Sequence, residues 1–174
     1  MIYDVSEYQH TITNAALEQV LRLQHENYTD NQHPSDKFAN ALMGKIGEAA
    51  WALHLGLSVD EILDDGQGPD FTHLKGWDLD VKTAKHRSSC INVRSYTLDK
   101  PNLDRLCILA ATADPQSFRA SLKGTITGPN LCGLPVHNPA LGHSKPYIRI
   151  AWDQLTPLRP KNGGQPVEKG VDNL

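Results

Sequence analysis

Three acidic residues and one lysine stand along this chain in an order that suits a hydrolytic metal site. Glu48 comes first, a Pro69-Asp70 pair follows, and an Asp80-Val81-Lys82 triplet comes last. Magnesium prefers oxygen ligands and is commonly held by one or two carboxylates, waters and a substrate phosphate. Such an ion can neutralise charge, activate water and stabilise a leaving oxygen, which is what cutting a phosphodiester requires. These residues are therefore the candidate catalytic group.

The first acid falls in a segment whose pattern predicts a helix over residues 35–55. Ser35 or Asp36 is placed to cap its start, and Gly56 is placed to end it. At 100° per residue, Glu48 lies about 120° from the apolar stripe of this helix, on the same side as Gly44, Trp51 and Leu55, while the stripe consists of Phe38, Leu42, Ile46, Ala49 and Leu53. An acid on such a buried side must be paired, protonated or bound to metal. Pairing with Lys45 or Lys82 is the alternative to a metal.

The other acids fall in two segments with the pattern of strands. Residues 70–74 and 78–84 are separated by a short connection that contains Gly76, which predicts an antiparallel hairpin. Because side chains on a strand alternate, Leu79 and Val81 should face one way, and Asp80 and Lys82 the other. We expect the apolar pair to anchor the strand and the charged pair to open onto a site. The Val81 carbonyl can add an oxygen ligand.

The remaining pattern predicts one domain over residues 1–160 and a polar tail over 161–174. Helical spacing predicts a helix over 13–28, capped by Thr13. An acidic, glycine-containing stretch over 59–68 predicts a loop. Further strands are expected over 91–98, 106–112, 118–127 and 147–158, with a turn or short helix over 101–105 and a long proline-rich loop over 128–146.

The helix with Gly47-Glu48, the Pro69-Asp70 pair and the Asp80-Val81-Lys82 triplet, in this order, resemble the PD-(D/E)xK nuclease superfamily, which has a restriction-endonuclease-like fold. The resemblance covers about residues 35–112. It implies an α/β fold with a central mixed β-sheet flanked by helices, preceded here by an N-terminal helical segment. It also implies a Mg²⁺-dependent enzyme, with Mn²⁺ as a substitute, that hydrolyses DNA, an endonuclease being favoured. Glu48, Asp70, Asp80 and the Val81 carbonyl would be metal ligands, and Lys82 the catalytic lysine.

The distribution of charge is compatible with a DNA partner, although the net charge is −3. Residues 1–74 contain 12 acidic and three basic residues, whereas residues 75–105 contain seven basic and four acidic ones. A basic region of this kind can bind phosphates. Lys85, His86, Arg87 and Arg94 follow the proposed triplet and are the candidate DNA-binding residues.

Composition and cysteine content limit the cellular compartment in which the protein is expected. No apolar run approaches the roughly 20 residues of a membrane-spanning helix, and Asp4 and Glu7 occupy the start of the chain. Three widely spaced cysteines predict free structural thiols in a reducing compartment. We therefore expect a cytoplasmic protein without a membrane partner or nucleotide cofactor. By the resemblance, it would belong to a bacterium, an archaeon or a phage. By analogy, a homodimer could form through the first helix or the proline-rich loop.

Three alternatives stay open at this point. The domain could be catalytically silent and bind nucleic acid or a protein partner, or it could cut RNA instead of DNA. Cys132, His137 and His143 carry the atoms that zinc prefers, and Cys90 or Cys107 could supply a fourth ligand. Their spacing matches no usual zinc finger, which favours ordinary loop histidines.

Overall fold

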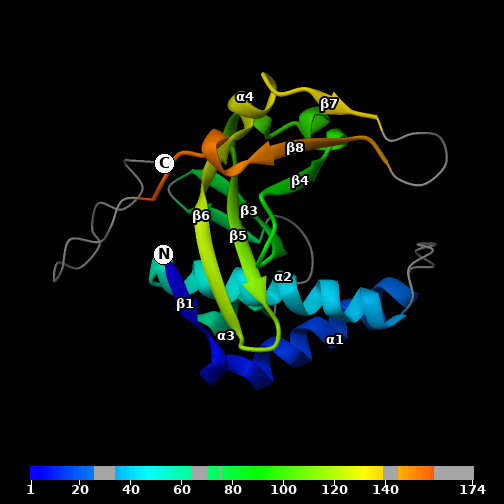
Figure 1. The fold of residues 1–174 in the computed structure, drawn as a ribbon, viewed down its shortest axis with the longest axis vertical. Coiled ribbons are helices and arrows are strands. Elements are labelled where there is room, and N and C mark those ends of the chain that lie inside the picture. Colours follow the sequence, from blue (N-terminus) through cyan, green and yellow to red (C-terminus); the bar gives the residue numbers. More distant parts are fainter. Residues whose placement is uncertain (26–33, 64–69, 75, 139–144, 159–174) are drawn as a thin grey trace, which may run out of the picture.

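The computed structural model describes residues 1–25, 34–63, 70–74, 76–138 and 145–158. It has a mixed α/β fold with a five-stranded sheet and a three-stranded sheet (Figure 1). The helices are α1 (Gln9–His25), α2 (Pro34–Leu55), α3 (Val59–Leu63) and α4 (Gly128–Leu131), with 3₁₀ turns η1 (Ser6–Tyr8), η2 (Ser95–Asp99), η3 (Leu103–Arg105) and η4 (Trp152–Gln154). The strands are β1 (Ile2–Asp4), β2 (Phe71–Leu74), β3 (Trp77–Lys85), β4 (Cys90–Arg94), β5 (Leu106–Asp114), β6 (Arg119–Thr127), β7 (Val136–His137) and β8 (Tyr147–Ala151). Within these residues, no helix is long and apolar enough to cross a membrane.

The larger sheet is mixed, as the resemblance implied, and its strand order is β1-β6-β5-β3-β2. β3 and β5 run parallel from the Asp78–Leu106 pair to the Lys85–Ala113 pair, while the other neighbours are antiparallel. β5 lies in the middle of this sheet, and its first eight residues are all buried, as expected for a strand that is covered on both faces.

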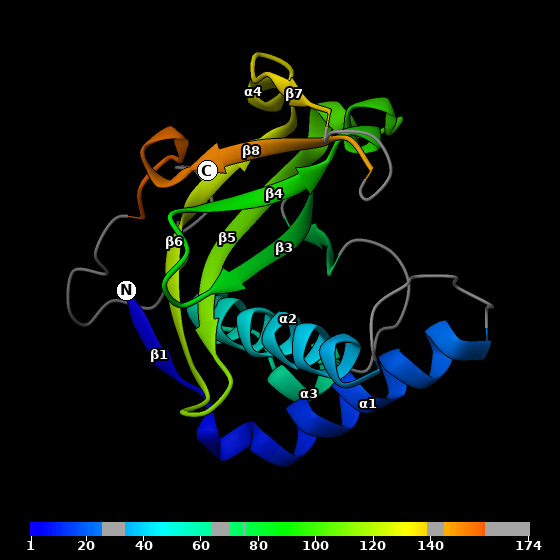
Figure 2. The ribbon, with the colours of Figure 1, turned by 45° about the vertical axis from the view of Figure 1, so that its right-hand side comes forward.

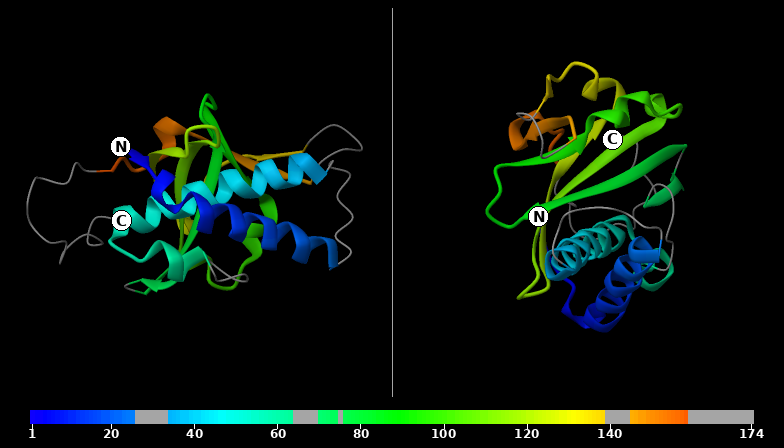
Figure 3. Two further views of the ribbon diagram at one scale, coloured as in Figure 1. Left: turned by 90° about the horizontal axis from the view of Figure 1, so that it is seen from below. Right: turned by 90° about the vertical axis from the view of Figure 1, so that its right-hand side faces the viewer.

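The two faces of this sheet are covered differently. Leu79 and Val81 of β3 join a core formed with α2 and α3, and α1 packs beside α2 (Figure 3). The opposite face, which includes Ile108 and Ile126, packs on the three-stranded sheet β4-β8-β7 (Figure 2). The expected helical flank is therefore present on one face, while a second sheet covers the other. Sequence patterns predicted its strands β4 and β8, though not their pairing.

The elements that carry the candidate site match the predictions closely. α2 ends at Leu55, and Gly56 adopts a φ of +76°, the left-handed conformation that glycine favours at a helix end. β2 and β3 form the antiparallel hairpin, with Gly76 at a φ of +86°. The predicted strands at β5 and β6, the short helical turn η3, and the strand β8 followed by a turn are also confirmed.

Other segments differ from the predictions. α1 begins at Gln9, so Thr13 lies inside the helix rather than at its cap. In the same way, α2 begins at Pro34, so Ser35 and Asp36 lie inside its first turn rather than at its cap. Residues 59–63 form α3 instead of a loop, because Val59 and Leu63 are buried in the core. β4 stops at Arg94 and passes into η2, while α4 and β7 interrupt the predicted proline-rich loop. The predictions for Pro69, residues 64–68, Lys75, His143 and the tail 161–174 lie outside the described residues.

Candidate active site

The candidate site begins where the pairing of the hairpin stops. β2 pairs with β3 at Leu74–Trp77 and Phe71–Leu79 with an irregular register. Beyond Leu79, no described strand pairs with this edge of β3, so its backbone groups need other partners. The Asp70 carboxylate takes this role, because its Oδ2 accepts a hydrogen bond from the Val81 backbone N–H at 2.5 Å. The short hairpin therefore fixes Asp70 directly beside the Asp80-Val81-Lys82 triplet.

The alternation predicted for the triplet is confirmed. Leu79 and Val81 belong to the helix-side core, whereas Asp80 and Lys82 share the opposite orientation and form an ion pair. Lys82 Nζ donates hydrogen bonds to Asp80 Oδ1 and to the Val81 carbonyl, the latter at 3.4 Å. The Asp80 side chain is 11% exposed, and that of Lys82 is 34% exposed. The lysine can therefore reach solvent while the aspartate holds it in place.

Glu48 has a partner in the structure, and it is one of the two lysines considered from the sequence. Lys45 Nζ lies 2.7 Å from Glu48 Oε2, with both residues buried on α2. Their separation of three positions places them on one side of the helix. Burial of an unpaired carboxylate is costly, and Lys45 removes that cost. Sequence reasoning placed Glu48 correctly on a buried side, and the pairing shows how the charge is tolerated there.

Three of the four candidate catalytic side chains line one hollow. A cavity of about 330 Å³ is lined by Glu48, Asp70, Val81 and Lys82. Asp80, which was predicted as a metal ligand, is not part of its lining and forms an ion pair with Lys82. The rest of the wall comes from the facing surfaces of α1 and α2, namely Gln19, Leu23, Lys37, Asn40, Ala41 and Gly44. The α2 positions 37, 41, 44 and 48 follow helical spacing, so the sequence did indicate that Lys37 lies on the same side of the helix as Glu48. The contribution of α1 depends on tertiary packing.

The electrostatics of this hollow leave one carboxylate without a compensating charge. Lys45 balances Glu48, and Lys82 balances Asp80. Burial, and then the negative charges of Glu48 and Asp80, raise the pKa of Asp70 to about 7, against the opposing effects of Lys82 and the Val81 N–H. Burial acts to lower the pKa of Lys82, but Asp80, Asp70 and Glu48 outweigh it and raise that pKa. Asp70 is thus where an additional positive charge would be most stabilising.

The oxygen atoms at this cavity suit a hard cation that takes only a few of its ligands from the protein. One or two carboxylates, a backbone carbonyl and solvent are the ligands that magnesium usually takes from a protein, and Asp70, Glu48 and the Val81 carbonyl offer them at one cavity. In the described ranges, no three His, Cys, Asp or Glu side chains are grouped closely enough to hold a metal by themselves. Comparisons with family models, curated proteins and solved structures gave no match.

Three of the four predicted DNA-binding residues gather beside this site. Lys85, His86 and Arg87 line a second hollow of about 800 Å³ together with the first half of α2 and the β5–β6 turn. Asn40 lines this hollow as well as the smaller one, so the two adjoin. Arg94 does not join them, because it lies at the end of β4 in the second sheet.

The residues considered for zinc do not assemble in the part of the chain that the structure describes. All three cysteines are free, with Cys107 buried and Cys132 exposed. Burial raises the pKa of the Cys107 thiol to about 12, which disfavours the thiolate that a metal needs. The ring of His137 stacks on that of Tyr147, with centroids 5.5 Å apart. His137 therefore has an aromatic partner.

The raised pKa of Asp70 predicts metal binding that strengthens with pH. Asp70 must lose its proton before it can bind a cation, so the apparent affinity for Mn²⁺ or Mg²⁺ should fall about tenfold for each pH unit below about 7. Without metal, the folded protein holds this proton more tightly than the unfolded chain does. The contribution of Asp70 to the free energy of unfolding should therefore decrease as the pH rises from about 4 to 7, and level off above. Calorimetric titration across this range measures the affinity.

The Asp70→Asn variant provides the control for this effect. The amide oxygen can still accept the Val81 N–H bond, but the negative charge is gone. At pH 8 without metal, the variant should melt at a higher temperature than wild type, and Mn²⁺ should no longer raise its Tm. Equal metal affinity of wild type at pH 5.5 and pH 7.5 would contradict this role of Asp70.

Proposed function

We propose that this protein is a metal-dependent nuclease that hydrolyses phosphodiester bonds in DNA. The observation that supports this most directly is the shared cavity, in which Asp70 lacks a balancing charge while Glu48 and Lys82 lie in the same wall. A partly buried carboxylate with a raised pKa next to a lysine is typical of functional sites. The basic residues Lys85, His86 and Arg87 of the adjoining hollow are compatible with a polyanionic substrate, and the acids Asp36 and Asp114 line the same hollow.

Each residue has a distinct part in the proposed reaction. A divalent ion bound here would supply a hydroxide near neutral pH and neutralise charge on the phosphate. Asp70, fixed by the Val81 N–H, and Glu48 would hold that ion from the strand and the helix side. Lys82 would orient the attacking water or the scissile phosphate, because its ammonium group is held at the wall by Asp80 and remains partly exposed. Asp80 keeps that ammonium in position.

Cleavage should require both the metal and Asp70. Supercoiled plasmid and linear, single-stranded and branched DNA are incubated with the protein in Mg²⁺, Mn²⁺ or EDTA, and products are separated on gels. We expect cutting of at least one substrate in Mg²⁺ or Mn²⁺ and none in EDTA. Asp70→Asn should reduce the rate by about 100-fold or more, because one displaced metal ligand removes much of the charge stabilisation.

Asp153→Asn is the matched control, since Asp153 is an exposed carboxylate on η4. It should cut like wild type. Cleavage that persists in EDTA, or that survives the loss of Asp70, would show that the activity arises elsewhere. An RNA panel of the same lengths distinguishes deoxyribonuclease from ribonuclease activity.

A second function is favoured by a different observation. Lys45 and Lys82 already neutralise Glu48 and Asp80, so the fold tolerates these acids without a metal. A silent domain that only binds nucleic acid would need nothing more. Such a protein would bind DNA in EDTA, cut no substrate in Mg²⁺ or Mn²⁺, and gain no thermal stability from either ion.

A further inference from the structure

The three-stranded sheet presents one face that takes no part in the core. Ile91, Val93, Ile148 and Ile150 point toward β5 and β6 and are buried. The residues that alternate with them point away and form the outer sheet face, which we define as Asn92 and Arg94 of β4, Tyr147 and Arg149 of β8, and His137 of β7. Asn92 pairs directly with Arg149, and Tyr147 lies between Arg94 on one side and His137 on the other.

This outer sheet face has positive charge without compensation. Its two arginines are exposed, and its strands β4, β7 and β8 contain no acidic residue. Within the described part of the chain, neither arginine forms an ion pair. Lys145, just before β8, is exposed as well. Unpaired guanidinium groups at this spacing suit phosphate oxygens, which they can bind with two parallel hydrogen bonds.

The same face has aromatic surface beside its charge. His137 is exposed, and its ring is nearly parallel to that of Tyr147, with an interplanar angle of 21°. Tyr96 is 58% exposed just after β4. Flat rings on a sheet, interleaved with arginine, are the usual platform for unpaired nucleobases, since every base has a face that can stack. In a duplex those base faces are already covered by neighbouring base pairs.

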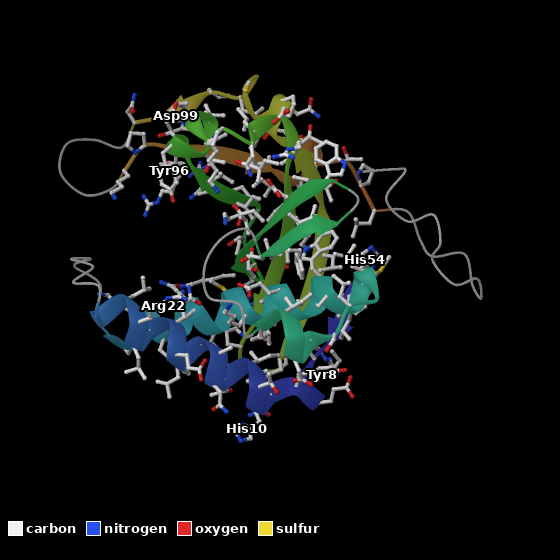
Figure 4. All side chains as sticks on the ribbon, turned by 180° about the vertical axis from the view of Figure 1, so that it is seen from behind. Tyr8, His10, Arg22, His54, Tyr96 and Asp99 are labelled. Carbon is white, nitrogen blue, oxygen red and sulfur yellow. The ribbon has the colours of Figure 1, made fainter. Side chains whose placement is uncertain are left out.

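We propose that the outer sheet face binds single-stranded DNA, with Arg94 and Arg149 on the backbone and His137 and Tyr96 stacked on bases. Figure 4 shows Tyr96 and Arg22 toward the same end of the molecule, in the sheet layer and in the helix layer. Arg22 is next to Leu23, which lines the active-site cavity. The binding itself does not depend on the proposed hydrolysis. That the bound strand belongs to the substrate, which would then carry an unpaired segment, rests on the proposed function.

Binding is measured by fluorescence anisotropy with a labelled 20-nucleotide DNA strand in EDTA, so that no cutting occurs. Wild type should bind this strand at least tenfold more tightly than the matching duplex. The Arg94→Ala/Arg149→Ala variant should bind at least tenfold more weakly at low salt. Its slope of log affinity against log salt should be less steep by about 1.4, as expected for two lost phosphate contacts on a single strand.

His137→Ala and Tyr96→Ala, assayed at pH 8, should each weaken binding by about fivefold or more without changing that slope, because stacking releases no counterions. Arg119→Ala is the charge-matched control, since Arg119 pairs with Asp4 on the far sheet edge, and it should bind like wild type. Preference for duplex, a preference for an RNA strand of the same sequence, or unchanged binding by the double variant would each overturn the proposal. A protein that binds the strand but never cuts DNA keeps this inference and loses the proposed nuclease. A protein that cuts DNA but does not bind the strand through the outer sheet face keeps the proposed nuclease and loses this inference.

Discussion

Lys82→Ala is expected to slow DNA cleavage by about two to four orders of magnitude at saturating Mg²⁺, the range measured for removal of a positioned acid or base. The reason is its position, because Lys82 lines the cavity with a partly exposed side chain while Asp80 and the Val81 carbonyl hold its ammonium group. Lys37 also lines this cavity, but it comes from α2, whereas Lys82 is the lysine that is bonded to Asp80 and to the Val81 carbonyl. Single-turnover rates with excess enzyme measure the loss without interference from product release.

The metal-binding readout separates a catalytic role from a structural one. Lys82 donates hydrogen bonds and supplies no ligand, so Mn²⁺ should still raise the Tm of Lys82→Ala by mass action. Lys123→Ala, which removes a lysine that lies over the Trp152 ring, should cut at the wild-type rate. If Lys82→Ala cuts normally, the assignment is wrong. If it loses activity only in proportion to lost metal binding, Lys82 acts by organising the acids.

Gly47→Ala should destabilise the protein and inactivate it together. A β-carbon at Gly47 would lie 3.0 Å from Cβ and 3.1 Å from Cγ2 of Thr83, and closer still to its Oγ1. Such overpacking costs typically about 1–3 kcal/mol and sometimes more, which in a chain of this size lowers the Tm by roughly 2–4 °C for each kcal/mol. Relief of the clash requires α2 to move away from β3. Because Glu48 is the next residue on α2, this movement would also separate it from Asp70.

Gly44→Ala is the matched control on the same helix. The nearest atom to its new β-carbon would be Glu48 Oε1 at 4.0 Å, an ordinary contact, so replacement of glycine by alanine should stabilise by up to about 1 kcal/mol. Adding Thr83→Ala to Gly47→Ala removes Oγ1 and Cγ2 and should restore part of the lost stability. Thermal melts of wild type, Gly47→Ala, Thr83→Ala and the double variant complete the double-mutant cycle. Equal Tm values for Gly44→Ala and Gly47→Ala would show that the helix and strand separate easily.

The parts of the fold that local physics determines could be predicted from the sequence. α2 has a dense apolar pattern and Gly56 at its end, and β5 is an uninterrupted apolar run. By contrast, β1 exists because Ile2 pairs with Ser121, which is distant in sequence, and Ile2 itself is largely exposed. The sequence predicts a loop where α3 forms, because the acidic residues of this segment outweigh the helical spacing of Val59 and Leu63. In both cases a tertiary partner decided the structure.

The candidate site divides in the same way. The alternation of side chains along β3 and the position of Glu48 on its helix could be predicted, because each depends only on the residue spacing within one strand or helix. The hydrogen bond from Val81 to Asp70 depends on where the β2–β3 pairing becomes irregular, and the wall supplied by Gln19 and Leu23 depends on how α1 packs on α2. Neither leaves a local signal. The pairing of Glu48 with Lys45 was one of two predicted alternatives, the other being Lys82. It was predictable because Lys45 lies three positions before Glu48 on the same helix.

Among the described residues, no strand pairs with the edge of β3 beside Asp70, and this has a consequence for solubility. Backbone groups along a bare strand edge are a template for a strand of another molecule, and proteins guard such edges with charged side chains. Asp70 occupies the Val81 N–H, so it also blocks this route to aggregation. Variants that inactivate the site with an apolar residue, such as Asp70→Leu, should therefore self-associate in storage, where Asp70→Asn stays monodisperse. The proposed activity and the expected colloidal stability would then depend on the same carboxylate.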